Sequence, residues 1–94
     1  MIYVVCAKCG EKVLYYQKDR IGWLKRCYLN RIFAPSDLEK LQHDNNIKTP
    51  NDLPNLTCSC GNLIGTPMMH KDKRLAFRLE RGSFKRKKYK KEYL

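Results

Sequence analysis

Cys-Ala-Lys-Cys-Gly (residues 6–10) and Cys-Ser-Cys-Gly (residues 58–61) are the two stretches that decide the fold of this 94-residue chain. Each stretch pairs two cysteines and places a glycine directly after them. Thiolate pairs on two turns are typical ligands of a tetrahedral metal site, and glycine gives such turns the backbone freedom they need. We therefore predict one structural zinc ion, with four ligands: Cys6, Cys9, Cys58 and Cys60.

Other interpretations of the cysteines stay open at this point. Iron takes the same four thiolates, and reduced cysteines also occur as small core residues. A disulfide framework is disfavoured because the chain has five cysteines and no signal peptide precedes the first pair. A redox Cys-x-x-Cys pair normally opens a helix, whereas a β-like run follows Gly10. Cys27 is expected to be buried, although Cys27 or His70 could replace a ligand if the second pair cannot reach the ion.

The length and composition indicate one small domain that does not cross a membrane. A chain of this size buries a limited core, and a structural metal commonly supplies the missing stability. No apolar run approaches the roughly 18 residues that a membrane span needs. Free thiols suit a reducing compartment, so we expect a cytoplasmic protein.

The charge is strongly positive and unevenly distributed. The formal net charge is +11, and four thiolates with one zinc ion would lower it to about +9. Residues 1–47 hold eight Lys and Arg against five Asp and Glu, whereas residues 48–94 hold twelve against four. Such a field attracts polyanions without selecting a sequence.

Periodicity predicts a small antiparallel β domain, mainly β with some helix (α+β). Strands are expected at residues 2–5 and 12–17, joined by the first cysteine turn, and at residues 74–80, where apolar and polar side chains alternate. Residues 22–33 fit neither period cleanly, and we favour a strand that turns near Arg31. Residues 65–67 (Gly-Thr-Pro) are expected to form a turn.

One helix is expected within this β domain. Ser36-Asp37-Leu38-Glu39 has the pattern of a capping box and predicts a short helix at about 36–43, followed by a loop at 48–55. The last ten residues are dominated by Lys and Arg. We therefore divide the chain into a zinc-stabilised domain at 1–84 and a basic tail at 85–94.

The two cysteine pairs, each ending in Cys-Gly, resemble the knuckles of a zinc ribbon. The 48 residues between Cys9 and Cys58 exceed the usual ribbon spacing of about 15–20 residues. The long gap and the Cys58–Gly65 segment also resemble the Yippee and Mis18 type of β-tent domain, from which the Cys-x-Cys pair departs. The ribbon resemblance implies a role in nucleic-acid machines, and the β-tent resemblance implies binding of proteins or small ligands.

Basic and aromatic residues are interleaved towards the C-terminus, and they are the candidates for contacting nucleic acid. The candidates are Arg74, Arg78, Arg81, Lys85, Arg86, Lys87, Lys88, Tyr89, Lys90 and Lys91. A second group contains Trp23, Lys25, Arg26 and Arg31, in which we expect Trp23 to pack in the core. We expect His43 to lie on the exposed side of the helix end.

The sequence favours a non-enzymatic protein that binds nucleic acid. Aromatic residues suit unstacked bases, and no DNA-recognition helix is visible, so RNA is preferred, including ribosomal RNA in a small ribosome-associated or other ribonucleoprotein component. The alternative is a β-tent-type module that binds an acidic protein surface. An enzyme is disfavoured because four thiolates would close the metal site and no catalytic motif is present.

Overall fold

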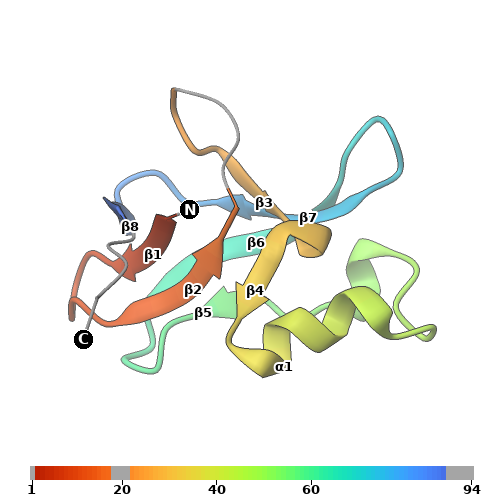
Figure 1. Ribbon diagram of the computed structural model, residues 1–94, viewed down its shortest axis with the longest axis horizontal. Helices are drawn as coiled ribbons and strands as arrows, with labels where there is room; N and C mark the ends of the chain where they lie inside the picture. Colours follow the sequence, from red (N-terminus) through yellow and green to blue (C-terminus); the bar gives the residue numbers. More distant parts are fainter. Residues whose placement is uncertain (1, 18–21, 89–94) are drawn as a thin grey trace, which may run out of the picture.

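Eight short strands form two four-stranded antiparallel sheets in the computed structural model of the chain, which describes residues 2–17 and 22–88 (Figure 1). Sheet A has the order β4-β2-β1-β8, with β1 (Ile2–Cys6), β2 (Lys12–Tyr16), β4 (Ile32–Ala34) and β8 (Phe84–Lys88). Sheet B has the order β3-β7-β6-β5, with β3 (Arg26–Tyr28), β5 (Leu56–Thr57), β6 (Leu63–Met69) and β7 (Leu75–Leu79). The predicted mainly β architecture is therefore confirmed in outline.

The core lies between the two sheets and is apolar throughout. Val4 of β1 and Phe77 of β7 have no exposed surface, and buried residues from both sheets form one cluster around them. Cys27 of β3 is fully buried in the same cluster, as predicted, and this burial raises the pKa of its thiol. Alternation along β7 is also as predicted, with Phe77 and Leu79 buried and Arg78 exposed.

A buried tyrosine links the two sheets through a hydrogen bond. Tyr16 of β2 is only 3% exposed, and its hydroxyl oxygen accepts a hydrogen bond of 3.0 Å from the backbone N–H of Tyr28 in β3. Desolvation raises the pKa of Tyr16 to about 12. The neutral phenol therefore satisfies its polar atom while its ring fills the core.

The segment at residues 22–33, which fits neither period cleanly, contributes to both sheets. After β3, the chain turns through a 3-10 helix, η1 (Leu29–Arg31), and then enters sheet A as β4. The expected turn near Arg31 is confirmed. The missed strand after it explains why no single period fits, because the buried face changes when the chain changes sheets.

The predicted helix is present, but its capping box is not. Helix α1 (Ser36–Glu39) continues into the 3-10 helix η2 (Lys40–His43), so the expected bounds of 36–43 are confirmed. Pro35 occupies the N-cap position, so Ser36 already lies inside the helix and cannot cap it. His43 is exposed, as expected, and pairs with Glu39 one turn earlier.

The predicted loop at 48–55 contains a third 3-10 helix, η3 (Pro50–Asp52). The backbone N–H groups of Lys48 and Thr49 donate hydrogen bonds to the Asp52 carboxylate, which lowers the pKa of Asp52. This segment is therefore a short helical turn held by hydrogen bonds to Asp52 rather than an open loop.

The prediction of a turn at residues 65–67 is wrong, because β6 runs straight through them. A Cβ atom on Gly65 would lie 2.8 Å from the carbonyl oxygen of Arg78 in the paired strand β7. Glycine is therefore needed here for close strand approach rather than for turning. Pro67 is tolerated because β5 pairs with β6 only as far as Gly65.

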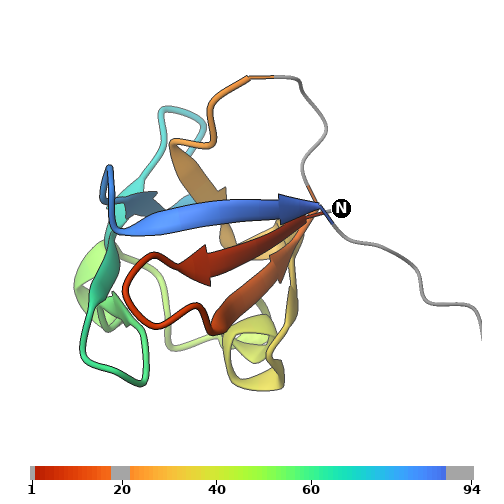
Figure 2. The same ribbon diagram turned by 90° about the vertical axis from the view of Figure 1, so that its left-hand side faces the viewer.

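The boundary between domain and tail is also wrong. Residues Phe84–Lys88 form β8, the edge strand of sheet A, which pairs with β1 from Cys6↔Phe84 to Ile2↔Lys88. Figure 2 shows β8 lying along β1. The dense positive charge suits an exposed edge strand, where lysines discourage pairing with other chains. The remainder of the predicted tail, Tyr89–Leu94, lies outside the described residues, as do Lys18–Ile21.

Replacing Gly65 with alanine should destabilise the protein. The added Cβ would force β6 and β7 apart, and overpacking of this kind typically costs about 1–3 kcal/mol. Chemical denaturation measures the change in the free energy of unfolding. Thr57→Ala, on an exposed position of β5, serves as the control and should have a much smaller effect. Equal stability of both variants would contradict the close approach at Gly65.

Shortening the chain to Phe84 should lower the melting temperature relative to a chain that ends at Lys88. The shorter chain loses most of the β1–β8 ladder, and each backbone hydrogen bond contributes about 1 kcal/mol net. In a domain of this size we expect a shift of about 5 °C or more, measured by circular dichroism. Identical melting temperatures would contradict the assignment of β8 to the folded domain.

Candidate functional site

The four predicted ligand cysteines converge at one end of the molecule. Their Sγ atoms all lie within 4.8 Å of one another, with 3.7 Å between Cys6 and Cys60 and 3.4 Å between Cys9 and Cys58. Four sulfurs about 2.3 Å from a tetrahedral ion would be spaced by roughly 3.8 Å. The cluster therefore has the size and the soft donor set of a metal site.

The first pair sits on the tight turn between β1 and β2. The backbone N–H of Cys6 donates to the carbonyl oxygen of Glu11 at 2.8 Å, and the N–H of Gly10 donates to the carbonyl oxygen of Cys6 at 3.0 Å. Gly10 has a φ angle of +77°, in the left-handed region that favours glycine. This closed turn aims both thiols towards the second pair.

The second pair sits on the turn between β5 and β6. The N–H of Cys58 donates to the carbonyl oxygen of Asn62 at 2.9 Å, and the N–H of Gly61 donates to that of Cys58 at 2.8 Å. Gly61 has a φ angle of +93°. A single residue between Cys58 and Cys60 is therefore enough for both thiols to reach the cluster, and no replacement ligand is needed.

The remaining ligand candidates lie elsewhere. Cys27 is enclosed in the core, and His70 contacts Arg26 and the ring of Tyr28. Within residues 2–17 and 22–88, no histidine or carboxylate joins the four cysteines as a potential ligand. The cluster is thus a pure thiolate set.

Hydrogen bonds around the cluster lower the pKa of one thiol, that of Cys6. The backbone N–H of Cys9 is the main influence that lowers the pKa of Cys6 to about 6, with help from Asn62 and Lys8. At Cys9 the N–H of Glu11 also lowers the pKa, but the neighbouring thiols and burial outweigh it and raise the pKa to about 12. Adjacent thiolates repel one another, so complete ionisation of the set requires a bound cation.

Asn62 connects the cluster to the turn between β7 and β8. Its side-chain amide N–H group donates to Sγ of Cys6 at 3.4 Å and to the carbonyl oxygen of Ser83 at 3.0 Å. The same oxygen accepts a hydrogen bond of 3.0 Å from the backbone N–H of Ala7. Both cysteine turns are therefore attached to the β7–β8 turn.

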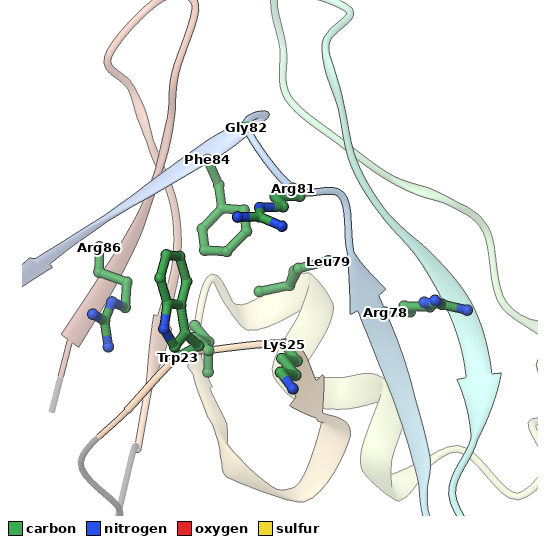
Figure 3. A pocket seen from close by; sticks show the side chains of 9 residues that line it. Trp23, Lys25, Arg78, Leu79, Arg81, Gly82, Phe84 and Arg86 are labelled. Atoms are coloured by element: carbon green, nitrogen blue, oxygen red, sulfur yellow. The ribbon is translucent and has the colours of Figure 1, made fainter.

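That turn forms one wall of a groove of about 620 Å³ (Figure 3). The groove is lined by Trp23, Leu24, Lys25, Arg78, Leu79, Arg81, Gly82, Phe84 and Arg86. Four of these residues are cationic and none is acidic. The lining residues come from the segment before β3, from the end of β7 and from β8, so the groove exists only in the folded chain.

Trp23 lines the groove and is 78% exposed. The expectation that it packs in the core is wrong. The guanidinium of Arg81 lies over its indole ring, 5.6 Å from the ring centroid. Arg86 donates a hydrogen bond of 2.6 Å to the carbonyl oxygen of Gly22, next to Trp23. Figure 3 shows the indole beside Phe84, with Arg81 and Arg86 on either side.

The structure gathers some of the predicted nucleic-acid-binding residues and separates others. Arg78, Arg81 and Arg86 line the groove, whereas Arg74 lies 3.9 Å from the ring centroid of Tyr28 and pairs with Asp72. Lys85, Lys87 and Lys88 are exposed on β8. Tyr89, Lys90 and Lys91 lie outside the described residues.

The outer face of sheet B carries a pair of like charges, one of which, Arg78, also lines the groove. Arg26 and Arg78 lie directly opposite each other on β3 and β7, an arrangement that is unfavourable in isolation. Arg26 also contacts Nδ1 of His70, where the arginine must be the donor. Positive charge thus continues from the groove onto this face.

The sequence groups Lys25 with Trp23, but it does not predict that Lys25 lines the same groove as Arg78, Arg81 and Arg86. The only signal in the sequence was composition, because basic residues flank aromatic residues both around Trp23 and in the segment towards the C-terminus.

Comparison of the chain with models of protein families, with curated proteins and with solved structures finds no match. Among the described residues, no helix has the length and apolar character needed to cross a membrane.

Replacing Cys9 with serine should remove the metal and destabilise the fold. Cys9 is exposed, so its thiol contributes little packing, and any large loss reflects the lost ligand. In a small domain the free energy of metal binding is largely free energy of folding. Elemental analysis should give one metal ion per chain for the parent protein and much less for the variant, with a clearly lower melting temperature.

Cys27→Ala is the matched control for this experiment. It also removes a thiol, but from the core rather than from the cluster, so metal content should stay at the parent level even if stability falls. A Cys9→Ser protein with parental metal content and melting temperature would show that the cluster does not hold an ion.

Proposed function

We propose that this chain is a non-enzymatic, zinc-stabilised protein that binds nucleic acid, and RNA rather than DNA. The observation that carries the proposal is the groove that the exposed Trp23 lines together with four cationic residues, Lys25, Arg78, Arg81 and Arg86. A small ribosome-associated or other ribonucleoprotein component in the cytoplasm fits this chemistry. Zinc is the proposed ion because tetrathiolate sets on paired turns are its common structural site.

Charge supports a polyanionic partner. The groove contains four cations and no carboxylate, and it continues onto the basic edge strand β8 and the facing pair Arg26 and Arg78. A phosphate backbone would neutralise these charges and relieve their mutual repulsion. Arginine is well suited to this role because its planar guanidinium can contact phosphate through two N–H groups.

Shape supports a single strand over a duplex. The longest helical segment in the described part of the chain is the eight-residue run of α1 and η2, and neither contributes to the groove. A recognition helix for the DNA major groove is thus missing from residues 2–17 and 22–88. An exposed aromatic ring among cations is instead typical of sites that stack unpaired bases.

The cysteine cluster supports a structural rather than a catalytic role. Catalytic zinc sites usually have three protein ligands and leave one position open for water. Four thiolates would occupy every position of a tetrahedral ion, so no water could be activated there.

A protein-interaction module of the β-tent type is the second candidate. The wide spacing of the cysteine pairs favours it, and the same cationic groove would then bind an acidic protein surface. Such a partner would be expected to bind with a weaker dependence on salt than a strand that contacts many phosphates.

Binding of a labelled single-stranded RNA should weaken steeply as salt increases. If the groove and β8 neutralise about six phosphates, the slope of log K against log salt should be near −4, since each phosphate contributes roughly −0.7. Replacing Lys85, Lys87 and Lys88 with glutamine should flatten that slope, and fluorescence anisotropy measures both quantities.

The control replaces two lysines that belong neither to the groove nor to β8, Lys40 in η2 and Lys48 before η3, and should leave the slope unchanged. Weak RNA binding even at low salt would contradict the nucleic-acid proposal. The acidic-protein interaction would then become the leading function.

A further inference from the structure

We propose that the Trp23 groove is the site of a single unstacked nucleotide, whose base lies on the indole and whose phosphate lies between Arg86 and Lys25. This inference rests on the proposed nucleic-acid function and specifies what one part of the surface does. It assigns base stacking to Trp23 and phosphate binding to its cationic neighbours.

The exposure of Trp23 is the first observation that supports this inference. A tryptophan is a large apolar side chain, and leaving 78% of its surface in water sacrifices much of the free energy that burial would provide. Neighbouring Leu24 is buried, so the apolar core begins one residue after Trp23. The exposed indole is therefore a surface available for a planar partner, and base–aromatic stacking tolerates any base.

The fixed position of Arg86 is the second step. Its hydrogen bond to the carbonyl oxygen of Gly22 holds the guanidinium beside the residue that precedes Trp23. This bond uses one of five guanidinium N–H groups, so others remain geometrically free to contact a phosphate. Lys25, two residues after Trp23, lies on the same groove and supplies a second cation.

The lining and the volume of the groove are the third observation that supports this inference. The half-buried Phe84 lies beside the indole, Leu79 adds further apolar surface to the groove, and Arg81 lies over the ring (Figure 3). The volume of about 620 Å³ is within the range of sites for one small ligand, roughly 300–1,000 Å³. An apolar interior with cations around it matches a nucleotide, which has a flat base and a charged phosphate.

An acidic peptide would satisfy the cations but would not need the indole. Carboxylate side chains bind guanidinium groups and carry no flat aromatic ring, so they leave the exposed face of Trp23 unused. A duplex would keep its bases stacked on one another. The observations therefore favour an unpaired nucleotide, and the other partners become outcomes of the test.

The fluorescence of Trp23 provides a direct readout, because this is the single tryptophan of the chain. We expect a ten-nucleotide oligoadenylate to quench the fluorescence as it binds. An abasic phosphoribose chain of the same length carries the same charge and should bind without comparable quenching. Equal effects of the two ligands, or of an oligoglutamate peptide, would overturn the nucleotide site.

Variants provide a second readout, measured as anisotropy of labelled oligoadenylate. Trp23→Ala should weaken binding by roughly 5- to 150-fold with little change in the salt slope, since stacking is largely independent of ionic strength. Phe33→Ala, which removes another exposed aromatic side chain on β4, should change affinity little. Arg86→Gln should weaken binding more than Arg74→Gln, because Arg74 lies outside the groove.

The outcomes separate this inference from the proposed function. Strong, salt-dependent RNA binding that Trp23→Ala leaves unchanged would overturn the nucleotide site and leave the basic surface as the binding face. Absence of RNA binding at low salt would overturn both. Thermal melting of each variant shows whether the fold is retained, and the exposure of Trp23 predicts that it is.

Discussion

The convergence of four cysteine thiols is the constraint on which the rest of this structure depends. One pair belongs to the β1–β2 turn of sheet A and the other to the β5–β6 turn of sheet B, so the cluster fastens the two sheets at one end (Figure 1). The sheets are small, and among the described residues their shared core is a cluster of 14 buried side chains. A metal at this point would offset part of the conformational entropy that such a short chain loses on folding.

The same constraint reaches the basic groove. Ser83 accepts hydrogen bonds from Ala7 in the first cysteine turn and from Asn62 in the second, and its neighbours Gly82 and Phe84 line the groove. Phe84 also pairs with Cys6 in the β1–β8 ladder, so the cluster and the wall of the groove are joined by more than one contact. The cysteine cluster and the groove are therefore physically connected, although the two sites use different residues.

Strand β8 has two roles that are usually kept apart. It completes sheet A by pairing with β1, and it also presents a row of cationic side chains, including Arg86 at the groove. The pairing fixes where these charges lie, which a free tail could not do. A polyanion would therefore meet a surface whose charges are already in position, and this reduces the entropy lost on binding.

Local sequence patterns determined the features that depend on neighbouring residues. The cysteine and glycine spacing predicted the cysteine cluster and the β1–β2 hairpin, and alternation predicted β7 with Phe77 buried and Arg78 exposed. The helix at 36–43 was likewise foreseen, although its capping residue was not. These features follow from turn chemistry and side-chain periodicity, which a linear sequence displays directly.

The tertiary structure alone decided the features that depend on distant partners. Lys85–Lys88 have the composition of a solvated tail, and only the unpaired edge of β1 makes them a strand. The Gly-Thr-Pro sequence at residues 65–67 is typical of a turn, and only the close approach of the Arg78 backbone explains a glycine within a strand here. Trp23 and Arg86 are more than sixty positions apart, so their shared groove could not be inferred from spacing. Contacts between distant segments depend on how the sheets pack, and no local pattern records that arrangement.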